Sequence, residues 1–101
     1  MAGDYRVIVS PLAFADLNQI LEYIALQSPQ GAATMTDRLL EAIASLEILP
    51  RRHKLFQTRG NGPPVHSMPV DSFLVYYEVS ERPRVVRILS VQHGARQAPR
   101  F

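Results

Sequence analysis

Cysteine is absent from the 101 residues of this chain. Without thiols the protein can form no disulfide bonds and perform no thiolate chemistry. No apolar run approaches the ~20 residues needed to cross a bilayer, and the first residues lack the apolar stretch of a signal peptide. These absences favour a cytoplasmic protein with no membrane partner.

The length of 101 residues and the hydrophobic content of 47% are ordinary for one globular domain, so we expect a single domain over residues 1–101. Charge is unevenly distributed. Residues 1–50 carry two arginines against six carboxylates, whereas residues 51–101 carry nine basic residues against three carboxylates. Ten of the eleven basic residues are arginine, which suits bidentate recognition of phosphate or carboxylate. The second half therefore predicts a polyanionic or acidic partner, unless the arginines only solubilise an exposed sheet edge.

The first half predicts a strand followed by two helices. Residues 5–9 are β-prone, and Ser10-Pro11 then supplies an N-cap and a first-turn proline. Apolar residues recur at helical spacing to about residue 27, and Ser28-Pro29 repeats the same start signal. With almost no linker between them, the two helices should form an antiparallel hairpin.

The apolar stripe of the second helix runs from Ala32 to Leu49, and Pro50 should end this helix. Asp16 and Glu22 lie off the apolar stripe of the first helix, so we expect both carboxylates to face water.

The second half predicts a polar loop over residues 51–64, which opens on Arg-Arg-His-Lys, and then three strands over 65–68, 73–79 and 84–91. Leu55-Phe56 is expected to be a short extended anchor in that loop, because loops of such length usually need one or have a function. Residues 80–83 form a turn signal, so the last two strands should pair as a hairpin. The fold class is therefore α+β, in the order β-α-α-β-β-β, with a helical hairpin packed on a small antiparallel sheet.

The last strand carries an arginine in its interior. Strict alternation places Val85, Arg87, Leu89 and Val91 on one face and the intervening valine and isoleucine on the other. An interior arginine needs solvent or a partner. Arg87 therefore indicates either an anion contact or an ion pair with Glu78 on the neighbouring strand.

Other chemistry has little support in the sequence. The three histidines lack metal-ligand spacing, no serine lies in a nucleophile-elbow context, and no cofactor or small-molecule motif is present. Gly60-Asn61-Gly62 is a turn and not a phosphate loop, because no helix follows it. What remains is a basic constellation: Arg59, His66, Arg84, Arg87, His93, Arg96 and Arg100.

Several short segments together match a known family. They are Ser10-Pro11-Leu-Ala-x-x-Asp16-Leu17-x-x-Ile20 with Tyr23-Ile24-Ala25, Ala42-Ile-x-x-Leu46 before Pro50, Phe73-Leu-Val-Tyr-Tyr-x-Val79, and Val86-Arg-Ile-Leu-x-Val91-x-His93-Gly94-x-Arg96. On these residues the whole chain resembles the RelE/ParE superfamily, the toxins of bacterial type II toxin–antitoxin (plasmid stabilisation) modules. The resemblance implies the fold order given above.

The resemblance implies one of two activities. RelE-like members are ribosome-dependent endoribonucleases that need a base, an acid and positive charge around one phosphate. Here Leu74 stands where they carry an arginine, the strand before it lacks their lysines at about Val65 and Ser67, and a tyrosine expected near the C-terminus is absent. ParE-like members poison DNA gyrase, and their His-Gly-x-Arg ending matches better, although many have arginine at the position of His66.

We therefore expect a ParE-like toxin that needs no cofactor or metal. Its target-binding residues would be Arg59, His66, Arg87, His93, Arg96 and Arg100. As an alternative, a metal-independent ribonuclease would use His66, Arg87, His93 and Arg96. Both alternatives imply an antitoxin with an acidic, partly disordered segment as partner. A third possibility is an orphan binding module of the same fold that is no longer toxic.

Overall fold

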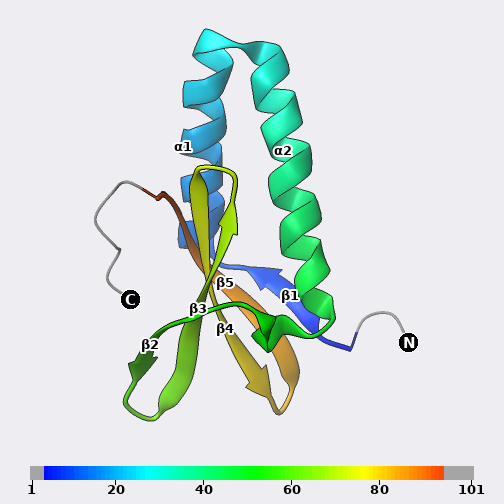
Figure 1. Cartoon of the computed structure of the whole chain (residues 1–101), viewed down its shortest axis with the longest axis vertical. Coiled ribbons are helices and arrows are strands. Elements are labelled where there is room, and N and C mark those ends of the chain that lie inside the picture. Colours follow the sequence, from blue (N-terminus) through cyan, green and yellow to red (C-terminus); the bar gives the residue numbers. More distant parts are fainter. Residues whose placement is uncertain (1–3, 95–101) are drawn as a thin grey trace.

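The computed structural model describes residues 4–94, with the side chain of Arg59 left aside. Two helices pack against a five-stranded sheet (Figure 1). The elements in chain order are β1 (Arg6–Val9), α1 (Pro11–Gln27), α2 (Pro29–Ala44), the short 3-10 helices η1 (Ser45–Glu47) and η2 (Pro50–Arg52), β2 (Leu55–Arg59), β3 (Gly62–Val70), β4 (Phe73–Glu81) and β5 (Arg84–His93). The predicted α+β class and helical hairpin are confirmed.

The sheet has the strand order β1-β5-β4-β3-β2. β5 pairs antiparallel with β4 and parallel with β1, so the first strand of the chain lies beside the last one. The expected order omitted β2. Leu55-Phe56 was expected to be only a short extended anchor in a polar loop, but Leu55–Arg59 pairs with β3 through two register irregularities and forms the far edge of the sheet.

Both helices begin where the sequence predicts. Ser10 Oγ accepts a hydrogen bond from the backbone N–H of Ala13 at 3.1 Å, and Ser28 Oγ accepts one from Gly31 at 2.9 Å. Each cap satisfies an N–H group that the first helical turn leaves unpaired. Among residues 4–94, neither helix is long and apolar enough to span a membrane.

The second helix ends earlier than predicted, at Ala44. The chain continues through η1, and Leu49 adopts a left-handed backbone conformation with φ 47° and ψ 54°. Leu49 was expected on the apolar stripe, but its side chain is 72% exposed. The helical periodicity fails here because the α-helix ends at Ala44, six residues before Pro50.

The core lies between the helical hairpin and one face of the sheet. It combines side chains of α1, α2 and η1 with side chains of the three central strands: Ala13, Leu17, Leu39, Ile43, Leu46, Met68, Val70, Val75, Tyr77, Val79, Val86, Ile88 and Val91. Figure 1 shows the two helices rising beyond the sheet, so their joined ends extend away from this core.

A bulge in β5 changes the expected alternation. Tyr77 pairs with Ile88 whereas Tyr76 pairs with Ser90, so Leu89 is an extra residue without a partner across the ladder. Val91 therefore joins Val86 and Ile88 in the core, and the prediction that it shares the face of Val85 was wrong.

Candidate functional site

His66 lies on the helix-covered side of the sheet. Its ring stacks on the ring of Tyr77 at 5.3 Å, and its Nδ1 lies 3.1 Å from the carbonyl oxygen of His53. The side chain is only 6% exposed, because the turn between η2 and β2 covers it. Tyr77 in turn donates its hydroxyl to the carbonyl of Pro50 at 2.5 Å, and burial raises the pKa of Tyr77 to about 12. His66 and Tyr77 thus form a buried cluster that holds the Pro50 and His53 carbonyls against the sheet.

Arg87 lies on the opposite face, because its neighbours Val86 and Ile88 both point into the core. Its Nε is 3.6 Å from Oε1 of Glu78, its cross-strand partner in the β4–β5 register. The ion pair that was one of two alternatives for Arg87 is therefore present. The guanidinium side chain remains 48% exposed, so it can still contact a partner.

His93 is at the end of β5, beside a hollow of about 650 Å³ between α1 and the sheet. Its ring meets Phe73 edge-on at 5.5 Å. The hollow is lined by Asp16, Gln19, Ile20, Tyr23 and Ile24 from α1, with Ser72, Phe73, Val91, Gln92 and His93 opposite. It thus combines an apolar floor with amide, hydroxyl and imidazole groups.

The carboxylate of Asp16 in this hollow is engaged in structure, contrary to the expectation that it faces water. Its Oδ2 accepts hydrogen bonds from Ser90 Oγ at 2.7 Å, the Val91 N–H at 3.0 Å and Gln92 Nε2 at 3.4 Å. Three donors of β5 thus converge on one carboxylate oxygen, and Asp16 clamps α1 to β5.

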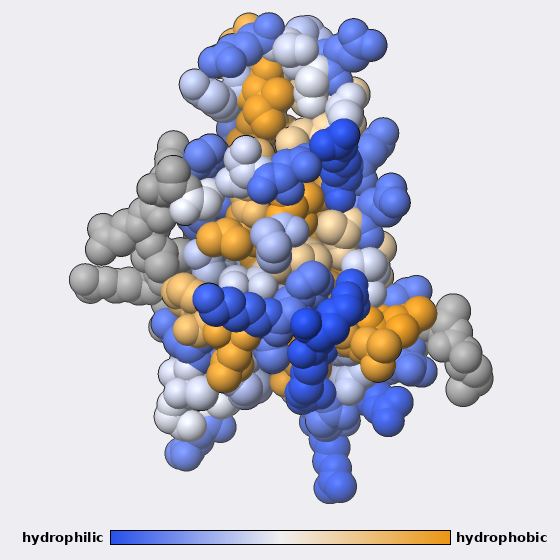
Figure 2. All heavy atoms as spheres, viewed as in Figure 1, coloured by the Kyte–Doolittle hydropathy of each residue, from blue (hydrophilic) through white to orange (hydrophobic). Residues whose placement is uncertain are grey.

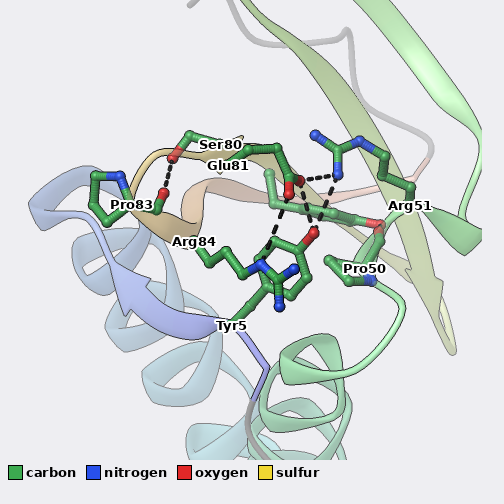
Figure 3. A network of polar contacts seen from close by, with 8 residues as sticks. Tyr5, Pro50, Arg51, Ser80, Glu81, Pro83 and Arg84 are labelled. Carbon is green, nitrogen blue, oxygen red and sulfur yellow. Dashed lines mark hydrogen bonds and ion pairs between the residues drawn. The ribbon is translucent and has the colours of Figure 1, made fainter.

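Arg84 takes part in a polar network where β1, η2 and the β4–β5 hairpin meet (Figure 3). Glu81 is its centre: it accepts hydrogen bonds from the Tyr5 hydroxyl at 2.7 Å and from Arg51, and its Oε1 lies 4.0 Å from Arg84 Nε. The guanidinium of Arg84 also lies 5.6 Å from the centre of the Tyr5 ring. The hydrogen bond from Tyr5 and then that from Arg51 lower the pKa of Glu81.

The predicted site residues are therefore not gathered at one place. His66 and Arg87 lie on opposite faces of the sheet, and His93 is six residues beyond Arg87, or about 20 Å along a strand. Arg59 is on β2, with its side chain outside the description, and Arg96 and Arg100 lie outside the described residues. Among residues 4–94, no group of three side chains could hold a metal ion.

Sequence reasoning missed Asp16, Tyr77 and Arg51 as organising residues. The periodicity of α1 gave no signal for Asp16, because its partners are more than 70 residues away. Tyr77 and Arg51 act on backbone and side-chain groups 27 and 30 residues distant, which no local pattern encodes.

Residues 7–98 match the family described as the ParE toxin of the type II toxin–antitoxin system parDE. The chain belongs to this ParE toxin family. The match extends from the first strand past the end of β5, so it includes both the helical hairpin and the sheet. Among curated proteins, no sequence matches this member of the family.

Solved structures show the same fold. A chain of the chromosomal ParDE system from P. aeruginosa superposes with a TM-score of 0.72 at 16% identity, covering 91% of this chain and 98% of that one. The archaeal RelE–RelB complex from Pyrococcus horikoshii OT3 gives 0.65 at 20% identity, covering 93% and 99%. The RelBE2 toxin–antitoxin complex from Mycobacterium tuberculosis gives 0.62 at 22% identity, covering 92% and 94%. At these identities the likeness concerns the fold, which ParE and RelE proteins share.

Proposed function

We propose that this ParE-family toxin inhibits growth by poisoning DNA gyrase and that a cognate antitoxin neutralises it. The observation that carries the proposal is the dispersal of His66, Arg87 and His93. Cleavage of RNA through its 2′-hydroxyl requires a proton acceptor, a proton donor and a cation within contact distance of one phosphate. These three residues cannot meet at one phosphate, because His66 and Arg87 lie on opposite faces of the sheet and His93 lies about 20 Å along the strand from Arg87.

Two carboxylates close to the predicted site residues already have structural partners. Asp16 accepts three hydrogen bonds from β5, and Glu81 binds Tyr5 and Arg51, so both carboxylates serve to hold elements of the fold together. Docking on a large protein makes no such demand, because binding energy can come from separated side chains over a broad surface. The exposed half of Arg87 and the basic C-terminal half of the chain fit this second requirement.

The antitoxin partner is supported by the family and by charge. The structural neighbours are described as toxin–antitoxin systems or complexes. Nine basic residues after position 50 favour an acidic segment as the neutralising element. Such a segment would order on binding, and its carboxylates would pair with the arginines.

A gyrase cleavage assay tests the proposal. The antitoxin-free protein is incubated with gyrase, supercoiled plasmid and ATP, and the products are examined after protein denaturation. Accumulated linear DNA is the expected result. A parallel reaction with translating ribosomes and mRNA provides the contrast. RNA cut at the ribosome with no linear DNA would replace the proposal by the RelE-like nuclease, and a folded protein inactive in both assays would indicate the orphan binding module.

A further inference from the structure

The segment from Ile48 to Leu55, called here the 48–55 turn, contains the short 3-10 helix η2 and leads into β2. It is held to the rest of the protein at nearly every residue. Pro50 O accepts from the buried Tyr77 hydroxyl, His53 O lies 3.1 Å from His66 Nδ1, and Lys54 O accepts from the Ser67 N–H at 2.9 Å. A surface loop with so many anchors has little conformational freedom to lose when it binds a partner.

Two arginine side chains add to this fastening. Arg52 donates to the carbonyl oxygens of Ser45, Ile48 and Leu49, at 3.4, 2.6 and 3.2 Å. Arg51 binds Glu81, and this joins the turn to the β4–β5 hairpin (Figure 3). The 48–55 turn is thus rigid because of its own side chains as well as its carbonyl groups.

This rigid turn displays Leu49 in a conformation that is unfavourable for leucine. A left-handed backbone costs leucine free energy that glycine, which lacks a Cβ atom, would avoid. Burial does not offset this cost, because the Leu49 side chain is 72% exposed and lies outside the core. An exposed apolar side chain held in a strained conformation is a feature expected of a binding residue.

The surroundings of Leu49 specify what it could bind. Ile48 and Leu55 are also exposed, at 43% and 49%. Of the three basic residues between them, Arg51 is paired with Glu81, Arg52 binds backbone carbonyls, and Lys54 is exposed. On the face of the molecule drawn in Figure 2, a strongly hydrophilic column has apolar surface on both sides of it. This pattern is complementary to a peptide segment that alternates apolar side chains with carboxylates.

We infer that the 48–55 turn is a docking site for the acidic segment of the antitoxin, with Leu49 as the apolar anchor and Lys54 as a charge contact. The inference rests on the proposed antitoxin partner and adds the place and the chemistry of the contact. A preformed turn lowers the ordering entropy on the toxin side, which matters because the antitoxin segment must itself become ordered.

The test uses Leu49→Gly in the full-length toxin. Glycine removes the side chain and also removes the backbone strain, so a binding role and a structural role predict different results. The probe is the product of the gene adjacent to that of the toxin, co-expressed and purified as a complex, with affinity measured by calorimetry after separation. We expect Leu49→Gly to weaken binding about tenfold or more, as for an anchor residue, with the melting temperature within about 3 °C of wild type.

Lys54→Glu is the second variant, because it reverses an exposed charge without touching the backbone contacts of the turn. We expect weaker binding and a smaller dependence of affinity on salt than in wild type. Leu26→Ser is the matched control: Leu26 is 87% exposed near the end of α1, in ordinary helical backbone, and its substitution should change affinity less than about twofold.

The outcomes distinguish a wrong partner from a wrong docking site. If wild-type toxin forms no complex with the neighbouring gene product, the proposed partner is wrong and the docking site falls with it. If wild type binds while Leu49→Gly binds equally well, or Leu26→Ser weakens binding as much, the partner stands and the docking site is wrong.

Discussion

The carboxylate of Asp16 accepts a hydrogen bond from the backbone N–H of Val91 at 3.0 Å and so joins α1 to the end of β5. β1 pairs with β5 only as far as Ile88, and beyond that point the Asp16 carboxylate takes the place of a neighbouring strand. Ser10 adds to the same junction, since its N–H donates to Ile88 O at 3.0 Å and its hydroxyl to Leu89 O at 3.3 Å. The start of α1 therefore fixes the bulge after which β5 leads to His93.

Asp16→Ala should lower the free energy of unfolding by about 2–3 kcal/mol, because it leaves the Ser90 hydroxyl and the Val91 N–H without their charged acceptor. Ser90 is completely buried, so water cannot easily replace the carboxylate. Urea denaturation followed by circular dichroism measures the change. Asp37→Ala, on the exposed surface of α2, is the control and should stay within about 0.5 kcal/mol of wild type. Equal stability of the two variants would mean that the Asp16 clamp contributes nothing.

Tyr77→Phe should cost about 1–2 kcal/mol, because the buried carbonyl of Pro50 loses its donor. The same substitution should change the response to alkali. The folded-state pKa of Tyr77 is raised to about 12, so the folded protein holds this proton more tightly than the unfolded chain, whose tyrosine pKa is about 10. The corresponding stability is complete below pH ~10 and is lost as the pH rises towards ~12.

Denaturation curves at pH 9 and pH 11 test this second effect. Wild type should lose more stability over that interval than Tyr77→Phe, and the other tyrosines cancel in the difference. A parallel decline of the two proteins would contradict the burial of the Tyr77 hydroxyl.

The environment of His53 should make the stability of the folded protein sensitive to acid. Burial, then the charges of Arg52 and His66, lowers the pKa of His53 in the folded protein. Because protonation is then harder in the folded state than in the unfolded chain, stability is present above pH ~6.5 and falls as the pH drops below it. Thermal melts at pH 7.5 and 5.5 should show a smaller acid loss for His53→Gln than for wild type. A loss of equal size in both proteins would assign the acid sensitivity to other groups.

Arg87→Ala should leave the free energy of unfolding within about 1 kcal/mol of wild type, since the Arg87–Glu78 pair is partly exposed and such pairs contribute little. We expect the same variant to reduce growth inhibition, because it removes an exposed cation from the proposed target surface. Glu78→Gln is the variant to compare with it, because this change weakens the ion pair but keeps the arginine. Toxicity lost in Arg87→Ala and kept in Glu78→Gln would assign the effect to the cation. Loss in both would assign it to the pair, and an unfolded Arg87→Ala protein would remove Arg87 from the site.

Local signals determined the helical half of the fold. Ser10-Pro11 and Ser28-Pro29 form caps from atoms within three residues of each other, so the sequence shows where both helices begin. The β4–β5 hairpin was equally visible, because its strands are separated only by Arg82 and Pro83. The combination of these segments also carried the resemblance to the toxin family, which the match over residues 7–98 confirms.

Tertiary structure decided what the candidate site contains. The bulge at Leu89 shifts Val91 into the core, and the turn over His66 buries a residue that the basic pattern placed at a binding surface. β2 escaped prediction because Leu55–Arg59 is short and pairs irregularly with β3. Asp16 meets its partners on β5 only when the chain is folded, and the left-handed backbone of Leu49 likewise exists only in the folded protein. The reason is the same in each case: capping and periodicity act over a few residues, whereas register, burial and clamps join groups that folding alone brings together.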